Sequence, residues 1–240
     1  MSDQTIQVRR DKFRPLSGPL TKLVNGLFAA VTLLGCLWAA GAHDWMGWVL
    51  FTQQYLATVL GIGLFVCFLA VKVRAGEPED RGIPWYDWLA AAVCLGVMGY
   101  IAVRYPVLVN DLGSRPPERW VLGIISVALI FEATRRTVGK VLVWLATAGI
   151  LYTAFSHLMP GDLYAPSSEW DEIATYLYLD GNGIVGLPIR VFSTIIITFI
   201  LFGQTLYALK GDRILNDAAI SLMGRYRGGP AKVAVAGSSL

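Results

Sequence analysis

The feature that most constrains this chain is the length of its apolar blocks. Several of them run for about 20 residues with few charges, and at ~1.5 Å rise per residue a helix of that length crosses a hydrocarbon core of ~30 Å. Only 15% of the residues are charged, against about 25% in soluble domains. The sequence therefore predicts an all-α integral membrane protein.

Six membrane-spanning helices can be drawn from these blocks. The expected spans are residues 20–42, 48–71, 86–103, 120–131, 141–159 and 191–209. The fourth block is short unless Ala133 and Thr134 extend it, with Arg135 and Arg136 reaching to the lipid headgroups. The sixth block contains no charged residue.

The lysines and arginines predict which way the chain enters the membrane. When alternate connections are assigned to opposite sides, sixteen of the 20 basic residues lie on the side of the N-terminal tail. The other side holds Arg104, Arg115, Arg119 and Arg190. Because cytoplasmic loops carry the excess of Lys and Arg, we expect the N-terminus to be cytoplasmic.

Two further segments have helical spacing without the length of a span. In residues 168–179 the apolar positions repeat every three or four residues, and Ser168 with Asp171 resembles a capping box. In residues 212–223 apolar pairs line one face, and Asp212 can cap the start. Both segments are predicted to be amphipathic interfacial helices, lying along the membrane surface or against other helices.

A break rich in glycine and proline follows each amphipathic segment. The first contains Gly181, Gly183, Gly186 and Pro188, and the second is residues 228–230. The three glycines also spell GxGxxG, but a dinucleotide site needs a preceding strand and an acidic residue about twenty positions on. Here a helix precedes the glycines and a span follows. We therefore interpret the glycines as a structural break, which at membrane depth must be covered by protein or a wet cavity.

The remaining reactive residues give no catalytic or metal-binding pattern. The three cysteines lie in three different spans, which favours packing over disulfides or metal ligation. His43 and His157 lie near span ends, without partners of ligand type. No paired carboxylates or Ser-His-Asp arrangement is recognisable. The sequence predicts neither an enzyme, nor a cofactor, nor a metal site.

Three polar clusters stand out, and two of them allow two interpretations. The hydroxyls and amide of the sixth span, including Thr194, Thr198 and Gln204, either pack helices together or line a solute path. Glu132 with Arg135 and Arg136 has the spacing of a local salt bridge at a span end. An acidic group on the outer side is either a solvated face or a docking surface; it comprises Asp162, Glu169, Asp171, Glu172 and Asp180. Broken helices beside spans point to a secondary transporter.

Three stretches carry a family resemblance. They are FEATRRTVGK at residues 131–140, YLYLDGNGIVGLPIRV at 176–191 and LMGRYRGGPAKVAV at 222–235. The chain resembles the fused membrane subunit of tripartite ATP-independent periplasmic (TRAP) transporters, in particular the TAXI type. The resemblance runs from about residue 120 to the end, and the earlier spans match in number and layout.

The resemblance implies a two-part organisation. Residues 1–136 would form a four-helix scaffold unit, and residues 137–240 would open the larger transport unit. It further implies a permease of the bacterial inner membrane that imports small organic acids, supplied by a periplasmic binding protein and driven by a sodium or proton gradient. The transport unit would move like an elevator against the scaffold. The competing hypothesis is a scaffold or assembly subunit that has no transport path of its own.

The resemblance also indicates which residues would approach the substrate and the cation. In the family, the run around residues 222–235 leads into a hairpin with a Ser-Gly-Ser-type turn that helps to build this site. The candidates here are Thr194, Thr198, Gln204, Gly228, Gly229, Pro230, Ser238 and Ser239. Since the sequence ends where that hairpin would begin, we expect it to be the N-terminal part of a longer permease or one piece of a split one. We do not expect it to transport alone.

Overall fold

The described residues of the computed structural model are almost entirely helical. The structure describes residues 12–16, 18–73, 82–111, 116–161, 164–166, 168–211, 217 and 220–221. Its elements are α2 (Pro19–Ala39), α3 (Ala42–Trp45), α4 (Thr52–Ala70), α5 (Trp85–Leu108), the 3-10 turn η1 (Val109–Asp111), α6 (Pro117–Thr137), α7 (Lys140–Phe155), the 3-10 turn η2 (Ser156–Leu158), α8 (Trp170–Leu179), α9 (Leu187–Val191), the π-helix η4 (Phe192–Ile196) and α10 (Ile197–Ala208). The predicted all-α class is confirmed.

Five of the described helical stretches are long and apolar enough to cross a membrane. They are Pro19–Ala39, Thr52–Ala70, Trp85–Asp111, Lys140–Leu158 and Leu187–Ala208. They confirm a multi-pass membrane protein and lie close to five of the six predicted spans. The fourth predicted span differs: α6 has 21 residues, but charged side chains lie near both its ends, so this stretch is not among the five.

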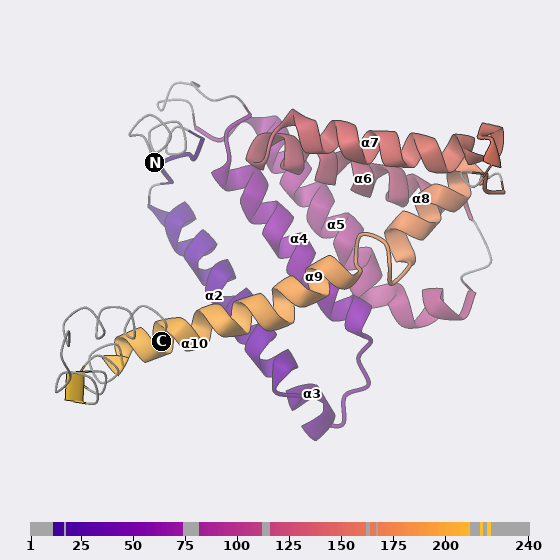
Figure 1. Ribbon diagram of the computed structural model, residues 1–240. Coiled ribbons are helices and arrows are strands. Elements are labelled where there is room, and N and C mark those ends of the chain that lie inside the picture. Colours follow the sequence, from indigo (N-terminus) through magenta and orange to yellow (C-terminus); the bar gives the residue numbers. More distant parts are fainter. Residues whose placement is uncertain are drawn as a thin grey trace, which may run out of the picture.

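The core lies between α4 and α5, which Figure 1 shows side by side. One apolar cluster joins Leu56 of α4 and Met98 of α5 to Tyr178 of α8 and to Val185 in the turn that follows α8. A second cluster packs Phe68 of α4 with Cys94 of α5 and Ala133 of α6. Residues before and after position 136 therefore share one core.

The helix ends alternate between two sides of the molecule. Segment 12–14, the end of α4, the start of α5 and the end of α6 meet at one side, which we call the basic end because it gathers Lys12, Arg14, Lys72 and Arg136. Trp38, Phe51 and Tyr105 lie at the opposite end, where Phe51 meets Tyr105 edge-on at 5.5 Å between ring centroids. The ends of α2, α4, α5 and α6 thus alternate as the count of Lys and Arg assumed, and the cytoplasmic position of the N-terminus stays a prediction.

Helix α8 packs against other helices. This is one of the two arrangements predicted for residues 168–179, which could lie along the membrane surface or against other helices. It crosses α6 where Gly123 contacts Ala174, and Tyr178 Oη donates a hydrogen bond of 2.6 Å to the carbonyl oxygen of Val97 in α5. Burial raises the pKa of Tyr178 above its usual range, so the hydroxyl remains a donor. The predicted capping box is wrong: the N-cap is Glu169, and no side chain caps the helix. Most of the second predicted amphipathic segment, residues 212–223, lies outside the described residues.

Candidate functional site

The sixth predicted span is a single helical rod whose hydrogen bonding changes along its length. α9 continues into the π-helix η4, and η4 continues into α10. A π-helix widens the turn and is found frequently at functional sites. In Figure 1 this rod leaves the turn after α8 and crosses α2.

The widened turn lies at the closest contact between this rod and the earlier helices. A Cβ atom on Gly35 of α2 would come within 2.8 Å of the carbonyl oxygen of Ser193, so only glycine allows the two helices this approach. Tyr55 of α4 donates a hydrogen bond of 3.0 Å from its hydroxyl to the same carbonyl oxygen. Ser193 itself is fully buried. The π-helix therefore presents one carbonyl group to both α2 and α4.

A stack of three rings continues from Tyr55 toward the opposite end. The ring of Trp38 lies 4.5 Å from that of Tyr55 and 4.1 Å from that of His43, and the planes are nearly parallel in both pairs. Stacking holds the Tyr55 ring, and hence its hydroxyl, in place. These rings border a cavity of about 300 Å³, where Gln54 donates from Nε2 to the carbonyl oxygen of Ala102 at 2.7 Å.

The predicted polar residues of the sixth span differ in their surroundings. Thr194 donates from Oγ1 to the carbonyl oxygen of Arg190 in its own helix at 2.7 Å. Oγ1 of Thr198 is buried and has no hydrogen-bond partner within the part of the chain that the structure describes. Gln204 is exposed and lies six residues further along, about 9 Å by helical rise. The other candidates, Gly228, Gly229, Pro230, Ser238 and Ser239, lie outside the described residues.

The glycines of the first predicted break form a compact turn between α8 and α9. Asp180 accepts from the backbone N–H of Asn182 through Oδ1 at 2.8 Å, and Ile184 donates from its N–H to the carbonyl oxygen of Leu177 at 2.8 Å. A Cβ on Gly183 would meet the Leu177 carbonyl oxygen at 2.5 Å, so the chain folds back directly on α8. Pro188 lies in the first turn of α9, where its missing N–H costs nothing. The turn thereby sets where the sixth span begins.

The sequence analysis missed a buried ion cluster at the basic end. Asp87 is completely buried in the first turn of α5, and its two carboxylate oxygens lie 2.5 Å from Arg14 Nη2 and 2.8 Å from Arg136 Nη1. Arg136 also pairs with Glu132 at 2.8 Å, and its guanidinium lies 4.9 Å from the centre of the Phe68 ring. The signal was available, because Asp87 is the only acidic residue inside the six predicted spans, and an ionisable residue there calls for a partner.

The N-terminal segment also closes the end of α4. Arg14 donates from Nη1 to the carbonyl oxygen of Phe68 at 3.3 Å, and its backbone N–H donates to the carbonyl oxygen of Ala70 at 2.9 Å. The last carbonyls of a helix lack intrahelical partners and attract cations. Segment 12–14 is therefore attached to α4 as well as to Asp87.

The comparison with known families concerns the C-terminal part of the chain, which contains the sixth predicted span and its π-helix. Residues 125–240 match the family model described as Tripartite ATP-independent periplasmic transporter, DctM component. The match covers 116 of the 240 residues, just under half of the chain. No curated protein and no solved structure matches the chain. The TRAP-like segment, residues 125–240, begins within α6 and includes α7 to α10.

Two of the polar contacts described above join the TRAP-like segment to the helices that precede it. At the basic end Arg136 binds Asp87, and at the π-helix the Ser193 carbonyl accepts from Tyr55. Arg136 and Ser193 belong to the matched residues, whereas Asp87 and Tyr55 precede them. The preceding helices thus hold both the start of the TRAP-like segment and its π-helix.

Replacing Tyr55 by phenylalanine should isolate the contribution of its hydroxyl. The variant keeps the ring stacked on Trp38 but leaves the Ser193 carbonyl without this donor, and an unsatisfied buried acceptor costs about 1–3 kcal/mol. Thermal unfolding of the purified protein in detergent measures the loss. Tyr207→Phe, at a tyrosine that is 70% exposed, is the control and should change little. An unchanged unfolding temperature for Tyr55→Phe would contradict the assigned role of this hydrogen bond.

Proposed function

We propose that this chain belongs to a fused, TAXI-type TRAP permease of the bacterial inner membrane. In this proposal the permease takes up small organic acids that a periplasmic binding protein delivers, and a sodium or proton gradient drives uptake. The observation that carries the proposal is the family match over residues 125–240. The π-helix within the matched span supports it, because π-helical turns are found frequently at functional sites.

Within this proposal, residues 1–136 act as the scaffold and residues 137–240 open the transport unit. The hydrogen bond from Tyr55 to Ser193 crosses the division after residue 136, and the ion pair of Asp87 with Arg136 lies directly beside it. Tyr178 and Val185 also pack with α4 and α5. These contacts favour a transport unit whose first part, residues 137–196, stays with the scaffold while its later parts move.

Reconstitution of the complete transporter that contains this chain tests the proposal. Proteoliposomes should take up a radiolabelled organic acid only when the loaded binding protein and an inward cation gradient are both present. Separate sodium and proton gradients identify the coupling ion. Uptake without the binding protein would exclude the tripartite mechanism, and uptake without any gradient would exclude secondary transport.

The second candidate function is a scaffold subunit without a transport path. The buried ion cluster favours it, since Arg14, Asp87 and Arg136 tie three helix ends and the N-terminal segment together at a position remote from η4. Cysteine crosslinking along α10 separates the two functions. A scaffold predicts that lipid-soluble reagents alone reach the faces of α10 that α2 leaves open, whereas a permease predicts one face that water-soluble reagents reach.

Replacing Thr198 by valine should reduce uptake if Thr198 lies on the solute path. Valine keeps the shape and removes the buried hydroxyl, and a lost hydrogen bond to a charged solute corresponds to about ten-fold or more in rate. The matched control is Thr205→Val, because Thr205 donates from Oγ1 to the carbonyl oxygen of Leu201 in its own helix. Initial uptake is measured at equal membrane abundance. Equal uptake by both variants would make Thr198 a packing residue.

A further inference from the structure

Helix α5 contains a proline close to its end. Pro106 lies two positions before Leu108, the last residue of α5. Proline has no N–H, so the carbonyl oxygen of Ala102, four positions earlier, lacks the donor that an α-helix normally provides. This stretch belongs to a helix long and apolar enough to cross a membrane, where a backbone carbonyl without a donor is costly. The break in α5 therefore calls for a donor from a neighbouring element.

Gln54 of α4 provides this donor. Its Nε2 atom donates a hydrogen bond of 2.7 Å to the carbonyl oxygen of Ala102. Its Oε1 atom accepts a hydrogen bond of 3.0 Å from the backbone N–H of Phe51, the N-cap of α4. Since an amide oxygen only accepts and an amide nitrogen only donates, these two bonds together fix the orientation of the amide. One side chain thus caps the start of α4 and replaces the N–H that Pro106 lacks.

The proline separates two parts of α5 that have different neighbours. Before it, Met98 and Ile101 pack with Leu56 of α4 in the core. After it, Arg119 of α6 donates from Nη1 to the backbone carbonyl oxygen of Asp111 in η1, and its Nη2 lies 3.4 Å from the Asp111 carboxylate. Helices bend sharply at proline, so a bend here would move the end of α5 with α6 while the preceding turns stay with α4.

The break also borders a cavity that is large enough for water. Gln54 and Ala102 both line the cavity of about 300 Å³ beside the stacked rings of Trp38 and Tyr55. A water molecule takes up about 30 Å³ in the liquid, and an ordered water forms a hydrogen bond nearly as good as a direct one. Water in this cavity can therefore take the place of Gln54 at the Ala102 carbonyl oxygen. The same acceptor then has two donors available, of which only Gln54 ties α5 to α4.

We propose that Pro106 is a hinge in α5 and that Gln54 is the latch that holds it closed. Leu108, beyond the hinge, is buried in the core, so the structure shows the closed position. In the open position water binds the Ala102 carbonyl, residues 107–111 move with α6, and the cavity beside Tyr55 widens. This inference concerns motion between α4, α5 and α6 and does not depend on the proposed transport function.

Hydrogen–deuterium exchange of the purified protein in nanodiscs, measured by mass spectrometry, tests the latch. The N–H of Val109 donates to the carbonyl oxygen of Tyr105 across the proline, so opening of the hinge exposes it. Gln54→Met keeps the length of the side chain and removes the donor. The amides of residues 107–109 should then exchange about ten-fold faster than in the wild type, the factor for the loss of one hydrogen bond. Wild-type exchange at residues 107–109 would overturn the latch.

Peptides from residues 120–133 of α6 distinguish the hinge from unfolding of the whole protein. They should exchange at the wild-type rate in Gln54→Met, because the hinge leaves the hydrogen bonds within α6 intact. Equal acceleration in α6 and at residues 107–109 would mean general unfolding and would also count against the hinge.

The dependence on the proline is the sharper test. Pro106→Ala restores an N–H for the Ala102 carbonyl, so Gln54→Met should accelerate exchange less than about two-fold in that background, the scale of additive changes. Gln53→Met is the matched control, since Gln53 precedes Gln54 in α4 and its Nε2 lies beside Gly181 in the turn after α8. It should leave exchange at residues 107–109 unchanged. If the full acceleration by Gln54→Met persists with Pro106→Ala, Gln54 does not act through the proline and the inference fails.

Gln54→Glu provides a second variant if Gln54→Met does not fold. It keeps an oxygen that accepts from Phe51 and replaces the donor by an oxygen that repels the Ala102 carbonyl. Its exchange at residues 107–109 is compared with and without Pro106→Ala, and Gln53→Glu is its control. Acceleration only in the presence of Pro106 is the expected result. Wild-type exchange, or equal acceleration in both backgrounds, would overturn the inference.

Discussion

Replacing Asp87 by alanine should destabilise the protein by about 3–5 kcal/mol, the range for removing one partner of a buried ion pair. Asp87 has no exposed surface, and the side chains of Arg14 and Arg136 are 7% and 4% exposed. Without the carboxylate, two guanidinium groups stay buried next to each other. Arg136 retains Glu132, but Arg14 loses its contact with Asp87 at 2.5 Å.

Equilibrium unfolding of the purified protein in mixed micelles measures this effect. The control is Asp44→Asn, because the Asp44 side chain is 76% exposed and its removal should cost less than about 1 kcal/mol. A triple variant, Arg14→Met with Asp87→Leu and Arg136→Met, should recover much of the loss, since apolar residues of similar volume replace buried ion pairs well. If Asp87→Ala unfolds like the wild type, the buried cluster contributes nothing to stability.

The sequence predicted the helical stretches because their signal is local. A block of apolar residues reports its own length, and five of the six predicted spans correspond to described helices that are long and apolar enough to cross a membrane. The salt bridges of Glu132 to Arg135 and Arg136 are confirmed at 2.7 and 2.8 Å, because i+3 and i+4 neighbours meet on any helix.

The contacts that position the candidate site could not be predicted in the same way. Arg136 reaches Asp87 across 49 positions of sequence, and Tyr55 reaches Ser193 across 138. Periodicity says which face of a helix is apolar but not which helix it meets. The π-helix was also missed, because no residue type at Phe192–Ile196 requires a wider turn. The π-helix lies where Gly35 of α2 comes close to Ser193, so its position follows from a contact between helices.

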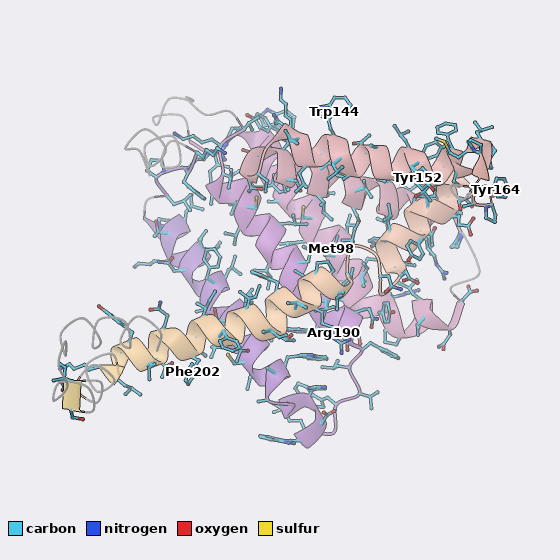
Figure 2. The ribbon with its side chains drawn as sticks, viewed as in Figure 1. Met98, Trp144, Tyr152, Tyr164, Arg190 and Phe202 are labelled. Atoms are coloured by element: carbon cyan, nitrogen blue, oxygen red, sulfur yellow. The ribbon has the colours of Figure 1, made fainter. Side chains whose placement is uncertain are left out.

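The exposed surface of α10 shows a second limit of local signals. Residues 201–209 are all exposed in the structure, and Phe202 and Tyr207 are 64% and 70% exposed. In Figure 2 Phe202 lies on the part of the rod that extends beyond α2. The apolar composition predicted a helix at residues 201–209, but it did not predict which surface covers that helix. Gln204 therefore remains a prediction as a path residue.

Replacing Gly123 by leucine should be the second most damaging change, with a cost of about 3 kcal/mol, the upper part of the usual range for overpacking. A Cβ on Gly123 of α6 would collide with the carbonyl oxygen of Ala174 in α8, which is backbone and cannot rotate away. The two helices must then separate. Separation removes Ile173 and Tyr178 from the core and breaks the hydrogen bond from Tyr178 to Val97.

Two measurements distinguish this separation of helices from general unfolding. In the folded protein burial raises the pKa of Tyr178, so separation should return its titration toward the ordinary tyrosine value of about 10. Ultraviolet titration of Gly123→Leu should therefore show one more tyrosine ionising in that range than the wild type does. Because the separated form then releases a proton more readily, raising the pH through about 10 should destabilise the packed form. Gly96→Leu, at an exposed glycine with open space around it, should leave both the titration and the stability unchanged. A Gly123→Leu protein with wild-type stability and titration would show that α6 and α8 do not depend on this close contact.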